Sequence, residues 1–455
     1  MNLKVGFGKA NITPPLGTLC AAGPDSACRT VMDDVFVRSV VLREGGRTVC
    51  LVSVDVLGLE RKDIEDLRAA ITAEAGIGPE DIVCHSTHTH ESPSARSSAS
   101  VLLAPHGLAF HSEGFYTMLL AGAGRAARQA LDSLRPATAR WGQAPVEDIA
   151  SNRRCGVVRD DNPKIPWIRS SRARPEHRAL PVGDIDPLVR ALVFCADDGR
   201  PFGVMFNYAC HVTVAGGDEA PYITADFPGE AIRRLEAEDG LEAIHFTGAA
   251  GDINPGKFTG SGNSIEERAA DVRNLGGRYA EAIRAAVRAA EPLGGDGLAW
   301  RTMPIFLPLH RDFPTTLDLA ADISTAVAAC KAAGNDARAR SQALDRLQRP
   351  ALRSAASRQA VGRQLATEIA ALRIGDGGAV FLPGECFLEI DRLIRRRAGI
   401  PRYMTVAYGD LSMGYICSRQ AYQEGGYESS VAFLQPEATD LLVEQAADLF
   451  HSLKV

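Results

Sequence analysis

The stretch CHSTHTHESP at residues 84–93 places three histidines, His85, His88 and His90, within ten positions of a chain that has only 10 histidines among 455 residues. The stretch follows an apolar run that predicts a strand, and residues i and i+2 of an extended strand point to the same side. A lone buried histidine is more often a core residue. For this pair we expect His88 and His90 to share a face, as two metal ligands or as one ligand beside an acid–base group, and His85 to be structural.

A further histidine and a carboxylate occupy comparable places in the sequence. His211 ends the apolar run GVMFNYACH, and Glu385 ends AVFLPGE. In α/β folds, functional groups gather at the C-terminal ends of strands. A glutamate in a loop indicates little by itself. Two histidines with one carboxylate, however, form a zinc-binding set that leaves a coordination position open.

Two loops allow two interpretations each. GAAGDINPG at residues 248–256 follows a predicted strand; its glycines could bring backbone N–H groups close to a ligand or an oxyanion, or could simply form a tight turn. IRSSRARPEHR at residues 168–178 is the one basic loop. It is either a solvated surface segment or a site where Arg169, Arg172 and Arg174 pair with a substrate carboxylate.

Hydrophobic periodicity predicts the elements that position these residues. Residues 34–42 and 48–59 are rich in Val and Leu and flank REGGR, which predicts a β-hairpin or an adjacent strand pair. A helical stripe at residues 61–76 and a short strand at residues 80–87 follow, which is an α/β pattern. Further strands are predicted at 187–196, 201–211, 242–248 and 368–385, and further helices at 114–134, 226–240, 266–291 and 436–453.

The segment around 317–370 differs from the rest because it is dense in Ala, Arg and Leu. It predicts a helical insertion of two or three helices. No internal sequence repeat is evident. We therefore expect one domain of mixed α/β class spanning residues 1–455, with this helical insertion.

Composition excludes several classes of protein. A net charge of −6 and a pI near 6.0 argue against a general nucleic-acid binder. No apolar stretch approaches the roughly 18 residues of a membrane span, and no apolar segment typical of a secretory signal is visible near the start. The ten cysteines form no C-x-x-C pair, which favours reduced core thiols. We expect a cytoplasmic protein with a small-molecule substrate; its oligomeric state is not indicated.

Several segments, taken in order, resemble the N-terminal catalytic domain of the neutral (alkaline, non-lysosomal) ceramidases, a family of zinc-dependent amidases. They run from residue 5 to about residue 430, so the resemblance covers most of the chain. The matching segments are VGFGKANITPPLG, VSVDVLGL, STHTHESP, NRR, DIDPLVRALVF, NYACHVT, GAAGDINP, FLPGE and GYICSRQAYQEGGYES.

The resemblance implies a role for each matching residue. It makes His90, the second histidine of THTH, the general base. It also places Arg153 and Tyr427 against the scissile carbonyl. The zinc ligands that it implies are His88, His211, Glu385 and Tyr415.

Two departures from the family pattern affect the expected substrate. Asn254 stands where the family has a serine, and asparagine can form hydrogen bonds but is not a nucleophile. The family also continues into an immunoglobulin-like domain, whereas this sequence ends after one more predicted helix. Aromatic residues make up only 6% of the chain. We therefore count Asn254 among the candidate catalytic residues and expect a substrate other than ceramide.

The expected function is a zinc-dependent hydrolase that cleaves an amide, ester or lactam bond of a small substrate with a zinc-activated water. A lyase or isomerase that uses the same zinc and His90 as the base is the alternative. A metal-bearing scaffold without catalytic activity is a third possibility, which the candidate base and oxyanion groups argue against.

Overall fold

The computed structural model describes residues 2–21, 26–158, 161–162, 166–168, 175–216, 222–260, 262, 264–295, 297–314, 316–334, 336–409 and 414–453. Helices and strands alternate along these residues, which confirms the mixed α/β class. The arginines of the basic loop, Arg169, Arg172 and Arg174, lie outside the described residues. No helix in the described ranges is long and apolar enough to cross a membrane.

Three sheets form the body of the protein, and each is built by the same order of elements. Each unit begins with a strand that pairs with the first strand of an antiparallel hairpin. A helix follows the hairpin and leads to a last strand, which pairs in parallel with the second strand of the hairpin. The sequence does not repeat, so only the topology does.

The bounds of these elements are as follows. The first unit comprises β1 (Lys4–Asn11), β3 (Phe36–Glu44), β4 (Arg47–Val54), α1 (Arg61–Ala75), β5 (Ile82–Ser86), α3 (Glu113–Asp132) and β6 (Arg135–Pro136). The second comprises β7 (Thr138–Pro145), β11 (Leu188–Cys195), β12 (Pro201–Tyr208), α5 (Asp226–Asp239), β14 (Glu242–Thr247), α6 (Ile265–Arg288) and β16 (Glu291–Pro292). The third comprises β17 (Leu298–Pro308), β19 (Gln364–Ile374), β20 (Gly377–Phe381), α9 (Leu388–Ala398), β22 (Arg402–Val406) and α12 (Glu437–Ser452).

Shorter elements complete the described chain. The short strands are β2 (Thr30–Val31), β8 (Ser151–Asn152), β9 (Arg154–Val158), β10 (Pro166–Ile168), β13 (Tyr222–Ile223), β15 (Ile253–Asn254), β18 (Ala360–Val361), β21 (Glu385–Cys386) and β23 (Tyr415–Ile416). The remaining helices are α2 (Ser97–Leu103), α4 (Pro175–Arg178), α7 (Thr316–Ala332), α8 (Ala337–Ser357), α10 (Arg419–Glu424) and α11 (Tyr427–Val431).

The predicted hairpin of the first unit is confirmed. Strands β3 and β4 pair antiparallel up to Glu44 and Arg47, which leaves a two-residue turn. Both turn residues, Gly45 and Gly46, have positive φ (54° and 84°), the conformation that such tight hairpin turns require and that glycine adopts without strain.

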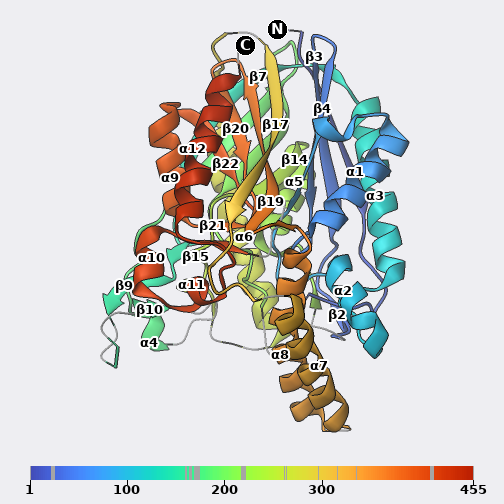
Figure 1. Cartoon of the computed structure of the whole chain (residues 1–455). Coiled ribbons are helices and arrows are strands. Elements are labelled where there is room, and N and C mark those ends of the chain that lie inside the picture. Colours follow the sequence, from blue (N-terminus) through green and yellow to red (C-terminus); the bar gives the residue numbers. More distant parts are fainter. Residues whose placement is uncertain are drawn as a thin grey trace.

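The inner faces of the three sheets share one apolar cluster. It contains Leu51 of β4, Phe246 of β14 and Phe381 of β20, and the rings of Phe246 and Phe381 meet with their centroids 5.9 Å apart. Helices cover the outer sides: α1 and α3 on the first sheet, α5 and α6 on the second, and α9 and α12 on the third (Figure 1). The ten cysteines are all buried, as expected for core residues such as Cys50.

The C-terminal ends of strands from all three units meet at one place. The N–H of Ala407, just after β22, donates to the carbonyl oxygen of Thr247 at the end of β14 (3.0 Å), and the N–H of Ser86 at the end of β5 donates to that of Tyr408 (3.1 Å). The loops that follow these strands are therefore held side by side. In α/β folds, functional groups gather at such C-terminal strand ends.

The helical insertion is shorter than predicted. Helices α7 and α8 form a hairpin that extends away from the body (Figure 1), and α8 ends at Ser357. Strand β19 begins at Gln364, inside the span predicted as helical, because QLATEIAALRI pairs along its whole length with β17. The predicted strand 201–211 is likewise too long, since β12 ends at Tyr208.

Candidate metal centre

Loops from the three units bring the sequence-predicted residues together. His88 follows β5 of the first unit, His211 follows β12 of the second, and Glu385 follows β20 of the third. All three side chains are buried, with 2 to 5% of their surface exposed. The Nε2 atoms of His88 and His211 lie 3.4 Å and 3.2 Å from the same carboxylate oxygen, Oε2 of Glu385. The structure thus brings His88, His211 and Glu385 together, as we expected from the sequence.

The backbone at His88 differs from the prediction. We expected an extended strand through His88 and His90, but β5 ends at Ser86 and His88 has a left-handed φ of 63°. Hydrogen bonds from the N–H of His88 to Val56 O and from the N–H of His90 to Val212 O, both 3.1 Å, hold this turn. The two rings still lie together, with centroids 5.0 Å apart. Their proximity thus comes from the turn and not from strand alternation.

Backbone carbonyl groups fix the orientation of two of the imidazoles. The Nδ1 atom of His88 lies 2.7 Å from Leu57 O, and that of His211 lies 2.5 Å from Ala250 O. Because a carbonyl oxygen only accepts, each Nδ1 carries a hydrogen, and the Nε2 atom is left to face Glu385. Histidines that bind metals are held in this way, through a hydrogen bond from the other ring nitrogen.

The chemistry of the converging atoms fits a cation. The Nε2 atoms of two imidazoles and a carboxylate oxygen converge in a buried space, and with both rings in the neutral form all three atoms are acceptors. A bound cation would satisfy all three at once, and nitrogen and oxygen donors of this kind suit zinc. Burial lowers the pKa of His211 to about 4, although Glu385 counteracts the shift, so at neutral pH this ring keeps its lone pair.

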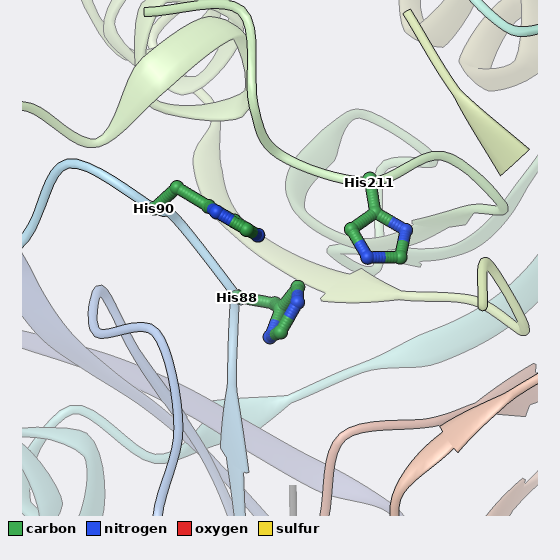
Figure 2. Close-up of side chains that lie close together, drawn as sticks. All are labelled: His88, His90 and His211. Atoms are coloured by element: carbon green, nitrogen blue, oxygen red, sulfur yellow. The ribbon is translucent and has the colours of Figure 1, made fainter. Parts of the chain in front are cut away.

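His90 lies in the same cluster. One ring nitrogen from each of His88, His90 and His211 lies within 4.8 Å of the other two (Figure 2). The Nε2 atom of His90 is buried and has no hydrogen-bond partner among the described residues. Burial, together with His88 and His211, holds the pKa of His90 well below its usual value, so the ring is neutral. This geometry permits His90 to act as a proton acceptor and equally as a third nitrogen ligand.

Tyr415 lies beside Glu385 because the two residues are in register. They are directly paired in the parallel ladder of β21 and β23, so their side chains leave the same face. Both residues line one cavity. Burial raises the pKa of the Tyr415 phenol, while the Arg153 guanidinium, which lies over the ring at 5.1 Å, opposes the shift.

Arg153 and Tyr427 occupy different positions in the site. Tyr427 is 49% exposed and lines the cavity. Arg153 forms a buried ion pair with Glu428 (Nε to Oε1, 2.8 Å) and donates from Nη2 to Gly251 O (2.8 Å). Its guanidinium also lies 5.8 Å from the centre of the Tyr427 ring. Arg153 therefore lies next to Tyr415 and Tyr427, while its Nε and Nη2 atoms already contact Glu428 and Gly251.

The loop GAAGDINPG supports the neighbouring chain. A Cβ atom on Gly251 would lie 2.4 Å from Glu385 O, so the loop needs glycine there to pass close to the segment that carries the carboxylate. The Asn254 Oδ1 accepts from Gly256 N (3.1 Å), which closes a local turn. Asn254 is not among the described residues that line the cavity. The loop thus packs closely on the segment of Glu385, and its Ala250 and Gly251 carbonyl groups also contact His211 and Arg153.

His85 has the structural place expected of it. It is fully buried, and its Nε2 accepts from Thr247 N (3.0 Å). Sequence reasoning missed Tyr408, whose ring stacks on His88 with centroids 4.3 Å apart. It also missed three arginines, Arg96, Arg349 and Arg353, that line the same cavity of about 330 Å³. No local pattern marks Arg349 and Arg353, because helix α8 reaches the site only in the folded chain, whereas Arg96 lies just six residues after His90.

Comparison with known proteins supports a family assignment. Residues 3–260, more than half of the chain, match the neutral/alkaline non-lysosomal ceramidases, N-terminal part. Among solved structures, neutral ceramidase from Pseudomonas aeruginosa is similar, with 17% sequence identity and a TM-score of 0.71 over 100% of this chain and 75% of that one. A ceramidase complexed with C2 is similar as well, with 17% identity and a TM-score of 0.71 over 99% and 75% of the two chains. No curated protein matches the sequence. The chain belongs to the neutral/alkaline non-lysosomal ceramidase family.

Proposed function

We propose that this ceramidase-family hydrolase is zinc-dependent and cleaves an amide, ester or lactam bond of a small substrate. The observation that supports this most is the convergence of the His88 and His211 Nε2 atoms on Glu385 Oε2, with both rings oriented by backbone carbonyls. These three residues would hold the ion, with Tyr415 as the fourth ligand. When bound, zinc lowers the pKa of water and polarises an acyl carbonyl.

The other residues of the site would handle the proton and the developing charge. Neutral His90 accepts a proton from the attacking water and returns it to the leaving nitrogen or oxygen, so that amide and water become carboxylic acid and amine. The Tyr427 hydroxyl, which lines the cavity, donates to the oxyanion. Arg153 contributes its positive charge from beside the Tyr415 and Tyr427 rings.

The proposed substrate is not ceramide. The cavity measures about 330 Å³, at the small end of the range for small-molecule sites, and three arginines line it. A ceramide needs a long apolar cleft. Asn254 in place of the family's serine adds a second difference in the loop next to Glu385. Soluble N-acyl compounds, lactams and esters are better candidates.

Hydrolysis in labelled water tests the reaction class. The zinc-loaded protein is assayed on short-chain N-acyl compounds, lactams and esters in H₂¹⁸O. A hydrolase places ¹⁸O in the product carboxylate. Product formed without ¹⁸O would instead support the lyase or isomerase alternative.

A parallel assay on short- and long-chain ceramides tests the substrate. We expect turnover far below the value of about 1 s⁻¹ that is common among enzymes. Ceramide hydrolysis at or above that rate would contradict the proposed substrate, while leaving the zinc-dependent chemistry intact.

A further inference from the structure

One wall of the cavity is formed by helix α8, which belongs to the protruding hairpin. Arg349 and Arg353 line the cavity from this helix, and their spacing of four residues places them on one face. The opposite side of the helix packs elsewhere: Leu347 and Ala351 are buried in an apolar cluster with Leu103 of α2. The hairpin is thus anchored by α2 and contributes two arginines to the wall of the cavity that also contains His88 and Glu385.

The two arginines form no ion pair, although Asp322 of α7 lies in their neighbourhood. Among the ion pairs of the described residues none contains Arg349, which is exposed, or Arg353, which is half-buried. Partial burial and the neighbouring Arg349 lower the pKa of Arg353, and Asp322 only partly offsets this. Surface arginines on this chain are commonly paired, as Arg397 is with Glu444 (3.0 Å). Two neighbouring cations without an ion-pair partner would be stabilised by an anionic ligand in the cavity.

A third arginine on the cavity wall has only part of its guanidinium group engaged. Arg96, just before α2, is 1% exposed, and only its Nη2 donates, to Ala21 O at 3.3 Å. Its Nε and Nη1 atoms are buried with no hydrogen-bond partner in the described structure. Burial lowers its pKa to about 10, although Glu60 and Asp63 act in the opposite direction. Buried donors of this kind are rare in proteins and call for a partner.

Arginines outnumber carboxylates among the described residues that line the cavity. Its carboxylates among the described lining residues are Glu91 and Glu385, and Glu385 would be occupied by the metal ion. Three arginines thus line the cavity together with these two carboxylates. Guanidinium binds carboxylates and phosphate-type groups through paired charge-assisted hydrogen bonds.

We propose that Arg349 and Arg353, with Arg96, bind an anionic group of the substrate, such as a carboxylate or phosphonate. The inference deepens the proposed function, because it assigns the substrate to acyl compounds that carry this negative charge. It also places the determinant of specificity on α8, in the helical insertion, away from the residues that would bind the metal.

Three matched amides test the inference: N-hexanoylglycine, N-hexanoylaminomethylphosphonate and the neutral N-hexanoylglycinamide. Dissociation constants are measured by calorimetry on chelator-treated protein, where neither turnover nor direct coordination to zinc interferes. The zinc-loaded protein supplies kcat/KM values for the same amides. We expect both anionic amides to bind at least about tenfold more tightly than the neutral one.

The variant Arg349→Gln/Arg353→Gln should reduce this preference to near one while binding of the neutral amide is unchanged. The matched control is Arg346→Gln, an exposed arginine of the same helix that does not line the cavity, and it should keep the preference. Thermal melting confirms that all variants are folded. Equal affinity for charged and neutral amides in the unmodified protein, or a preference that survives in the double variant, contradicts the inference.

The measurements separate this inference from the proposed function. Arginine-dependent binding of the anionic amides without any hydrolysis supports the anion site and contradicts the amidase. Hydrolysis with no dependence on charge supports the amidase and contradicts the anion site. Loss of the preference for only one of the two anions still supports the inference and identifies the group that the arginines recognise.

Discussion

At the residue scale, the metal centre depends on side chains held in unusual backbone conformations. His88 (φ 63°) and Tyr408 (φ 58°) both lie in the left-handed region without being glycine, and their rings stack on one another. Each such residue costs on the order of 1 kcal/mol or more, and such strain persists where the surrounding structure enforces it. Here the hydrogen bonds of the His88 N–H and Nδ1 atoms supply that constraint.

The first prediction concerns the ligands. His88→Ala and His211→Ala should each lower zinc affinity by more than about 100-fold, because each variant loses one of the proposed ligands. Loss of a group that only orients a ligand typically lowers metal affinity by about 10–100-fold. Metal analysis after dialysis checks this. His310→Ala, a histidine outside the cluster, should leave zinc stoichiometric. Stoichiometric zinc in both ligand variants would place the site elsewhere.

The second prediction concerns His90. His90→Ala should retain zinc and lose turnover by about 10²–10⁴-fold, the usual contribution of a general base. Metal content and kcat are measured on the same preparation. If zinc is lost together with activity, His90 is a ligand, as the three-histidine geometry also permits. Full activity would exclude both roles.

At the element scale, the site is assembled by short segments that pack edge to edge. The loop at Gly251 passes so close to β21 that its N–H donates to Cys386 O (2.8 Å). The register of β21 and β23 then sets Tyr415 beside Glu385. A displacement of this loop would move the carboxylate that the proposed ligand set requires.

The third prediction tests this packing. Gly251→Ala should lower the free energy of unfolding by about 1–3 kcal/mol, the usual cost of overpacking, and weaken zinc binding, because the new Cβ would lie 2.4 Å from Glu385 O. Denaturant unfolding and metal titration measure the two effects. Gly114→Ala, where a Cβ meets no atom within 4 Å in helix α3, is the matched control. Unchanged zinc affinity in Gly251→Ala would show that the close contact does not position Glu385.

At the scale of the whole molecule, three units of one topology face a common apolar cluster. Each unit contributes to that cluster, and each contributes a loop to the metal centre. None of the three sheets can bury its inner face without the other two. We infer from this that the chain folds as one domain.

The fourth prediction follows from the shared cluster. Phe246→Ala should lower the stability of the whole molecule by about 3–5 kcal/mol, because Phe246 is fully buried and contacts Phe381 in another unit. Calorimetry should show one transition in both proteins, at a lower temperature in the variant. Two separable transitions, of which only one shifts, would contradict a single cooperative domain.

The sequence by itself determined the local elements and the residues of interest. The hairpin at Gly45 and Gly46, the helix that ends at Gly76 and most strands follow from turn chemistry and periodicity, which depend on neighbours along the chain. The histidines and Glu385 were identifiable because their types suit a metal ion and because they follow apolar runs. Strand ends were less well predicted: His88 lies in a turn that periodicity does not reveal.

Only the tertiary structure decided which of these residues meet and what surrounds them. The threefold topology leaves no trace in the sequence, because pairing between distant strands depends on packing and not on local composition. The same holds for Arg349 and Arg353, which lie more than two hundred residues from His88 in the chain and line its cavity. In a helix that looks like ordinary Ala- and Arg-rich surface, only the folded arrangement distinguishes these two guanidinium groups from their solvated neighbours.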